Sequence, residues 1–168
     1  MWMMRIAPVL LAWPLLVQAQ PDAEPAVPTE PAVVAWQLQV MRDGQQIDAF
    51  EGTTTVGQAR TDTHHHVVQH AVGCKAQPGG DIDLMRTLTV SPTQADAAVV
   101  TLAIDAQETL EEPGVNQTES GCLLPPQPRR IAASHPGLSV PAGQWSTWTL
   151  VEHDPVLLYR VRAGLTNR

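Results

Sequence analysis

The chain has 168 residues, with 10 lysines and arginines against 17 aspartates and glutamates, and a formal net charge of −7. No basic cluster is present beyond Arg129-Arg130. An acidic chain of this kind lacks the basic face that a phosphate backbone requires, so we expect no nucleic-acid partner. The length suits one domain with a core of its own.

The first residues are typical of an export signal. Arg5 supplies a short positive segment, residues 6–17 are apolar, and Val17-Gln18-Ala19 fits the small-x-small pattern that precedes cleavage. We therefore expect residues 1–19 to be a signal peptide cleaved after Ala19, with an uncleaved anchor as the alternative. No later apolar run suits a membrane-spanning helix, so the mature chain is expected in the periplasm or outside the cell.

A proline-rich acidic leader follows the signal. Residues 20–32 contain four prolines and three acidic residues, a composition typical of an extended, solvated segment. Residues 33–168 are then expected to form a single β-domain. Without Arg5, 9 basic residues face 17 acidic ones, which gives the mature chain a charge of −8.

The segment from residue 33 to residue 51 predicts a β-hairpin. Asp43-Gly44 is a two-residue turn signal between two alternating segments. If Arg42 pairs with Gln45 and the pairing stays regular, five apolar side chains lie on one face of the hairpin, which we expect to point into the core. These side chains are Trp36, Leu38, Val40, Ile47 and Ala49.

The rest of the chain also reads as short strands between glycine and proline turns. Residues 84–90 alternate up to Pro92, and residues 99–104 are apolar on both faces, as in a central strand. Residues 108–127 read as a polar excursion, whereas 145–151 and 156–161 read as a last strand pair. This pattern predicts an all-β, single-domain antiparallel β-sandwich or partly open barrel.

The two cysteines predict a disulfide. Cys74 and Cys122 belong to a chain that we expect in an oxidising compartment, where pairing is the default. The alternative, thiolate ligation of a metal, lacks a CxxC motif to support it.

Four of the six histidines lie between residues 64 and 70. On a strand, His64 and His66 would point the same way and could share a zinc or copper ion. A third ligand would come from elsewhere, for example His135 or His153. The alternative is a set of exposed polar side chains with no metal, and we expect no cofactor by default.

Other chemistry has little support in the sequence. Ser134-His135 and Ser139 are present without a GxSxG motif, and no phosphate-binding glycine loop occurs. We therefore expect no enzymatic activity and no catalytic residues. Trp145 and Trp148 have an odd spacing and cannot share a strand face, so one of them could mark a partner-binding surface. The alternative is that both pack in the core around a bend.

Three stretches together resemble the core β-region of bacterial secretins, the ring-forming proteins of secretion and pilus systems. They are QVMRDGQQIDAFEG, RTLTVSPTQADAAVVTLAID and SVPAGQWSTWTL. The chain lacks the GGL sequence and the membrane-spanning hairpins of that family. The resemblance implies a small periplasmic β-module of similar architecture, working in envelope transport or assembly.

These observations lead to two functional expectations. The first is an exported, non-enzymatic β-domain that binds a protein partner in envelope transport, secretion or pilus assembly, using sheet edges and an exposed tryptophan. The alternative is a periplasmic zinc- or copper-binding protein that uses the histidine-rich stretch 64–70.

Overall fold

The structure is a computed structural model that describes residues 31–111, 117–125 and 127–166. The expected signal peptide and nearly all of the expected leader lie outside these residues. The described chain forms twelve strands and no helix, so these ranges contain no segment that could cross a membrane as a helix.

Eight of the strands form two four-stranded antiparallel sheets. Sheet A has the order β11-β12-β1-β2, and sheet B has the order β10-β9-β8-β3. The strands of sheet A are β1 (Val33–Arg42), β2 (Gln45–Thr55), β11 (Trp145–Val151) and β12 (Leu157–Leu165). The strands of sheet B are β3 (Arg60–His64), β8 (Arg86–Ala95), β9 (Val99–Glu111) and β10 (Pro128–Pro141).

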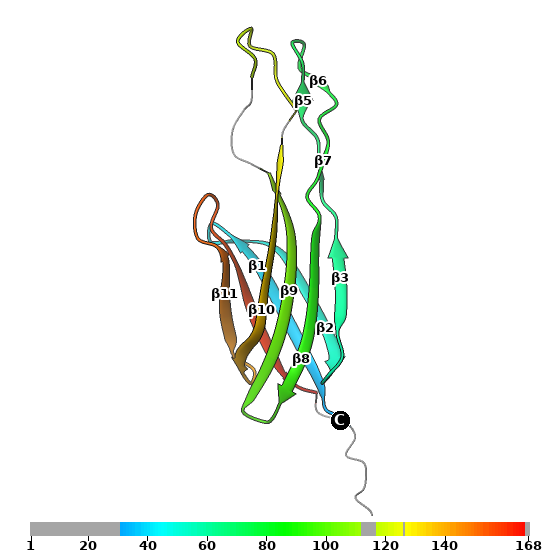
Figure 1. Ribbon diagram of the computed structural model, residues 1–168, viewed down its shortest axis with the longest axis vertical. Helices are drawn as coiled ribbons and strands as arrows, with labels where there is room; N and C mark the ends of the chain where they lie inside the picture. The colour runs from blue at the N-terminus through cyan, green and yellow to red at the C-terminus, as the bar shows by residue number, and fades with distance from the viewer. Residues whose placement is uncertain (1–30, 112–116, 126, 167–168) are drawn as a thin grey trace, which may run out of the picture.

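The two sheets pack face to face (Figure 1), which confirms the prediction of an all-β sandwich. Every second residue of the strands points inward, because successive side chains of a strand alternate between its faces. Burial of these apolar side chains is the main force that holds the sheets together. The most deeply buried are Val34, Leu38, Val40, Leu88, Val100, Leu102, Ile104, Val140, Leu157 and Tyr159.

The first hairpin has the predicted turn but a different register. Arg42 pairs with Gln45, as expected, and a β-bulge between Val40 and Met41 then shifts the pairing by one residue. Leu38 therefore faces Phe50, which is buried, while Ile47 is exposed. The prediction that Ile47 and Ala49 face inward is thus wrong, because it assumed regular alternation through the bulge.

Sheet B contains longer strands than the sequence pattern indicates. Strand β8 continues past Pro92 to Ala95, with a register shift between Pro92 and Gln94. Strand β9 extends to Glu111, inside the segment that reads as a polar excursion. Proline is tolerated here because β3 pairs with β8 only as far as Val90, so Pro92 lies beyond the end of that pairing.

A narrow projection, which we call the tower, rises beyond the sandwich (Figure 1). It comprises residues 65–85 and 117–125 and contains two short pairs, β4 (Val67–Val68) with β7 (Ile82–Asp83) and β5 (Ala71–Val72) with β6 (Gln77–Pro78).

A disulfide joins the two arms of the tower near its far end. The predicted bond between Cys74 and Cys122 is present. Beside it, Gly73 and Leu123 exchange two backbone hydrogen bonds of 2.7 and 3.2 Å. The disulfide therefore connects the segment between β3 and β8 to the segment between β9 and β10.

Candidate functional site

A row of ionisable side chains bridges the two sheets at the end of the core nearest the tower. The Arg86 Nε atom of β8 donates to both carboxylate oxygens of Glu108 on β9, at 2.8 and 2.7 Å. Glu108 also accepts from the hydroxyl of Tyr159 on β12. Arg86 Nη1 donates to Asp48 Oδ2 on β2 at 2.6 Å. Two residues from each sheet therefore share one hydrogen-bonded network.

The surroundings of this network shift its proton affinities in different directions. Burial raises the pKa of the Glu108 carboxyl, and the hydrogen bonds from Arg86 and Tyr159 offset this only in part. Burial and the neighbouring Glu108 raise the pKa of Tyr159 far above its usual range. Burial also opposes ionisation of Asp48, but hydrogen bonds from Arg86 and His64 outweigh it and lower the Asp48 pKa. Asp48 is therefore a carboxylate and Tyr159 a neutral hydroxyl at pH 7.

A pocket of about 550 Å³ lies next to the exposed end of this network. We call it the histidine pocket because three consecutive histidines line it. Its lining residues are Arg42, Ile47, Asp48, His64, His65, His66, Leu84 and Arg86. It combines the β1–β2 turn region, the end of β3 and the base of the tower.

Two of the three histidines are each held by a carboxylate through Nδ1. His64 Nδ1 lies 3.0 Å from Asp48 Oδ1, and the His64 ring stacks on Phe50 at a centroid distance of 4.1 Å. His65 Nδ1 lies 2.7 Å from Asp83 Oδ2. A carboxylate on one ring nitrogen orients the imidazole and leaves Nε2 for another partner.

The expected pairing of His64 with His66 rested on a strand that continues to residue 70. In the structure, β3 ends at His64, so regular alternation does not apply to His65 and His66. The backbone carbonyl of His66 accepts from the Leu84 amide at 2.9 Å. Among the described residues, no three His, Cys, Asp or Glu side chains lie together in a way that could hold a metal ion. Zinc or copper binding therefore stays a prediction.

The proposed third ligands lie elsewhere. His135, on β10, packs edge-on against Trp148 with ring centroids 5.6 Å apart. His153 is exposed in the segment between β11 and β12, and its nearest charged neighbour is Glu152 at 3.9 Å. Neither residue lines the histidine pocket.

The two tryptophans named as partner-binding residues point to opposite sides of sheet A. Trp148 pairs with Tyr159 and packs edge-on against it at 5.7 Å, on the core side. Trp145 pairs with Arg162 on the outer side, and the Arg160 guanidinium lies 5.2 Å from the centre of its ring. This distance suits a cation–π contact. Of these two half-buried tryptophans, Trp145 is therefore the one on the outer face of the sheet.

Trp145 begins a row of side chains that crosses all four strands of sheet A on its outer face. The paired residues of the row are Trp145 on β11, Arg162 on β12, Gln37 on β1 and Glu51 on β2. We call these four residues together with Arg160 the outer row. Its members offer an aromatic ring, two guanidinium groups, an amide and a carboxylate on one sheet face.

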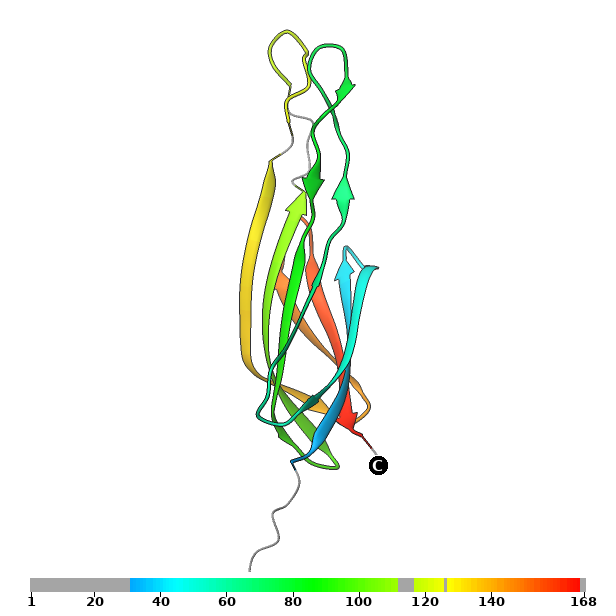
Figure 2. The ribbon, with the colours of Figure 1, turned by 90° about the vertical axis from the view of Figure 1, so that its right-hand side faces the viewer.

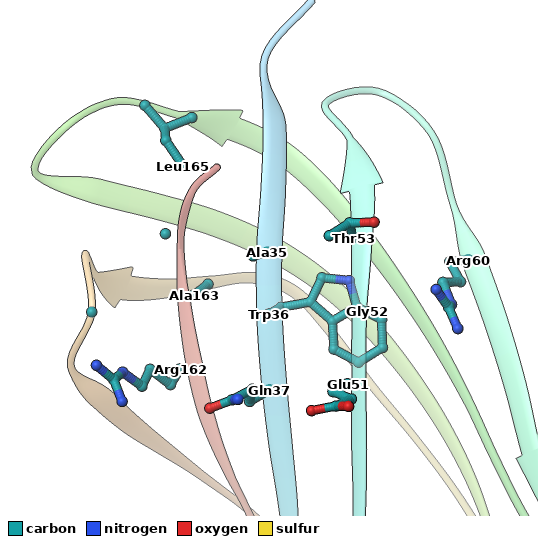
Figure 3. Close-up of a pocket in the computed structure, with 12 residues that line it drawn as sticks. Ala35, Trp36, Gln37, Glu51, Gly52, Thr53, Arg60, Arg162, Ala163 and Leu165 are labelled. Carbon is teal, nitrogen blue, oxygen red and sulfur yellow. The ribbon is translucent and has the colours of Figure 1, made fainter. Parts of the chain in front are cut away.

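A trough of about 550 Å³ adjoins the outer row (Figure 3). Gln37, Glu51 and Arg162 line it, and the small residues Ala35, Thr53 and Gly164 form the next row of the same face. Figure 3 shows β1 running through the middle of the trough, with Arg162 on one side and Glu51 on the other.

Gly52 lines the trough on the β2 side and allows a close approach of Trp36. A Cβ atom at Gly52 would lie 2.8 Å from Trp36 Cζ2 and 3.1 Å from Arg60 Cζ. The absence of a side chain thus admits the Trp36 indole, whose Nε1 donates to Thr54 Oγ1 at 3.0 Å. A close approach of this kind is a common reason for glycine inside a strand.

Several residues with catalytic side chains are not brought together. Ser134 and Ser139 lie on β10, on its exposed side. Glu111 lies 3.3 Å from His70 Nε2 at the base of the tower. Glu112 and Asn116, from an acidic pair and a glycosylation-type sequence, fall outside the described residues.

The sequence reasoning missed the buried network, the role of Asp48 and the outer row. Two signals for the network are visible in retrospect, since Arg86 and Glu108 occupy inward positions of two alternating apolar strands. Asp48 becomes inward only through the bulge, which the sequence does not mark. A search of protein-family models, curated proteins and solved structures found no match to the chain.

Proposed function

We propose that this chain is an exported, non-enzymatic β-domain that binds a protein partner in the cell envelope through the outer row of sheet A. The observation that carries the proposal is the continuous line from Trp145 through Arg162 and Gln37 to Glu51. Tryptophan and arginine are the residues most enriched at protein-binding hot spots.

The charge of this face also supports a protein partner. The outer row carries two arginines and one glutamate on a chain whose net charge is −7. A locally basic face on an acidic molecule favours a partner with an acidic patch, because complementary potentials increase the rate and specificity of association. The resemblance to the secretin core region agrees with a role in envelope transport or assembly.

Site-specific photo-crosslinking in cells that express the chain tests the proposal. A photo-reactive residue at Thr147, which flanks the outer row, is compared with one at Thr61, which is exposed on β3 at the edge of sheet B opposite β10. We expect a defined protein adduct only from position 147. Trp145→Ala and Arg162→Ala should abolish it.

The captured protein is then purified, and its dissociation constant is measured by calorimetry. Loss of a tryptophan hot spot typically weakens binding by about 2 kcal/mol or more, which is roughly thirtyfold. Gln107→Ala is the matched control and should bind like the wild type. Equal affinity of Trp145→Ala and the wild type would contradict the proposal.

A second candidate function is zinc or copper binding in the histidine pocket. It is favoured by His64 and His65, because Nδ1 of each imidazole contacts a carboxylate and Nε2 is left as the ligand atom. Calorimetry with each metal compares the wild type with a His64→Ala/His65→Ala variant and with His153→Ala as control. Binding that is lost only in the double variant supports this function, and equal weak binding by all three contradicts it.

A further inference from the structure

The upper part of β10 is an open sheet edge. Strand β10 has one hydrogen-bonded neighbour, β9, and ends the order of sheet B. Figure 2 shows β10 at the margin of the molecule, with no other described strand beyond it. From Pro128 to His135 its pairing with β9 is regular, and the first register shift follows His135.

The hydrogen-bonding pattern shows which backbone groups face the open side. The Thr109 amide donates to the Met85 carbonyl at 2.9 Å, so the backbone groups of Thr109 point toward β8. Hydrogen-bonded and non-hydrogen-bonded pairs alternate along an antiparallel ladder. Arg130, which pairs with Thr109, therefore directs its amide and carbonyl away from β9. The same holds for Ala132 and Ser134, two and four residues further along.

The other three sheet edges offer less for a partner strand. Strand β2 is interrupted by the bulge opposite Val40 and Met41, and its remainder contains Asp48, Glu51 and Gly52. Strand β3 has five residues and carries Arg60, Asp62 and His64, and charged residues on a short edge discourage pairing. Strand β11 has a register shift between Thr149 and Val151. Residues 129–135 of β10 form a regular stretch of seven without proline or glycine.

This open segment is symmetric about Ala132. Pro128 and Pro136 lie four residues before and after it, and neither has an amide hydrogen to donate. In an antiparallel pairing of two copies about Ala132, Arg130 faces Ser134 of the other copy and Pro128 faces Pro136. The prolines then coincide at the two ends of the pairing, and no arginine faces an arginine.

Charge complementarity supports the same register. Ser134 pairs with Asp105 on β9, and both residues are exposed on the outer face of sheet B. Arg130 of a second copy would lie beyond Ser134, about 9.6 Å from Asp105 at two strand spacings. The long arginine side chain can cross the small serine and approach the carboxylate, and the twofold axis repeats this contact.

We propose that two copies of this chain associate through their β10 edges, antiparallel about Ala132, and join two four-stranded sheets into one. The short edge buries a small area, so the dimer is expected to be weak and concentration-dependent. The pairing adds backbone hydrogen bonds from residues 130, 132 and 134 of each copy, and leaves the outer row of sheet A uncovered.

Sedimentation velocity over a concentration series tests the proposal. We expect the average mass of the full mature chain to rise from that of one copy toward that of two. Ala132→Pro removes one outward amide without removing a hydrogen bond to β9 and should abolish this rise. Ala132→Val keeps the amide and should dimerise as the wild type does. A single-copy mass at every concentration, or a dimer unaffected by Ala132→Pro, would overturn the proposal.

Hydrogen exchange provides a readout without a variant. The amides of Arg130, Ala132 and Ser134 should exchange more slowly as the wild-type concentration rises, whereas Gln107, on the neighbouring strand, should not respond. Protection that appears only when the captured envelope protein is added would assign the edge to a different partner and overturn the dimer. Crosslinking from position 147 is independent of this result, so the two proposals can fail separately.

Discussion

The Nε atom of Arg86 lies 2.8 and 2.7 Å from the two carboxylate oxygens of Glu108, and both side chains are almost fully buried. Each of these charges would be costly to bury alone, because transfer of an unpaired ion to the interior costs several kcal/mol. The ion pair therefore fixes β8 and β9 in positions where the side chains of Asp48 and Tyr159 from sheet A can hydrogen-bond to it.

Removal of the Glu108 carboxylate should destabilise the fold strongly. We expect Glu108→Ala to lower the free energy of unfolding by about 3–5 kcal/mol, because it leaves Arg86 with one of its two acidic partners. Urea denaturation measures the change. Glu119→Ala, an exposed acid on the tower, should stay within about 0.5 kcal/mol of the wild type.

The lowered pKa of Asp48 predicts an acid-dependent contribution to stability. The contribution is fully present above the unfolded-state pKa of about 3.9 and is lost as pH falls through the lower folded-state value. The difference in unfolding free energy between the wild type and Asp48→Asn should therefore shrink below about pH 4. A difference that stays constant between pH 6 and pH 2.5 would contradict this assignment.

The bulged register of the first hairpin predicts which substitutions are costly. Phe50→Ala should lower the unfolding free energy by about 3 kcal/mol, because the side chain packs in the core. Ile47→Ala should cost about 0.5 kcal/mol or less, since Ile47 is exposed. Thermal unfolding of both variants distinguishes this register from a regular one, in which Ile47 would be the costly position.

Gly52→Ala tests the close approach of Trp36. The added methyl group would need a displacement of the indole, and overpacking of this kind typically costs about 1–3 kcal/mol. Gly137→Ala is the matched control, because a Cβ there would lie 3.8 Å from Thr101 Cγ2 at an ordinary contact distance. Similar melting temperatures for the two variants would show that the strand near Gly52 adjusts freely.

Reduction of the Cys74–Cys122 bond should weaken the chain without unfolding the sandwich. The chain-entropy estimate for a closed segment of this length is about 4 kcal/mol, as an upper value. In a Cys74→Ala/Cys122→Ala variant, amides of the tower should exchange rapidly while those of β9 near Leu102 stay protected. Loss of protection at Leu102 would show that the tower is required for the core.

The sequence predicts the fold class well because alternation and turn residues are local signals. Asp43-Gly44 identifies the first turn, and the apolar run from Val99 to Ile104 identifies a central strand, as the structure confirms. The disulfide also follows from a count of two cysteines in a chain that the sequence predicts to be exported.

The candidate sites were less accessible to sequence reasoning because they depend on register and on pairing between distant strands. The bulge after Val40 turns Asp48 inward, and no residue type signals that shift. The outer row brings Trp145 and Glu51, which are 94 positions apart in number, onto one line through the pairings of β12 and β1.

The disulfide in the tower also closes a covalent ring. The bonded cysteines are 48 positions apart, and both β8 and β9 lie between them. A protease that cuts one peptide bond of the tower between Cys74 and Cys122 would therefore leave a single covalent molecule. Such a nicked chain would migrate intact on a non-reducing gel and separate into two fragments only when the bond is reduced.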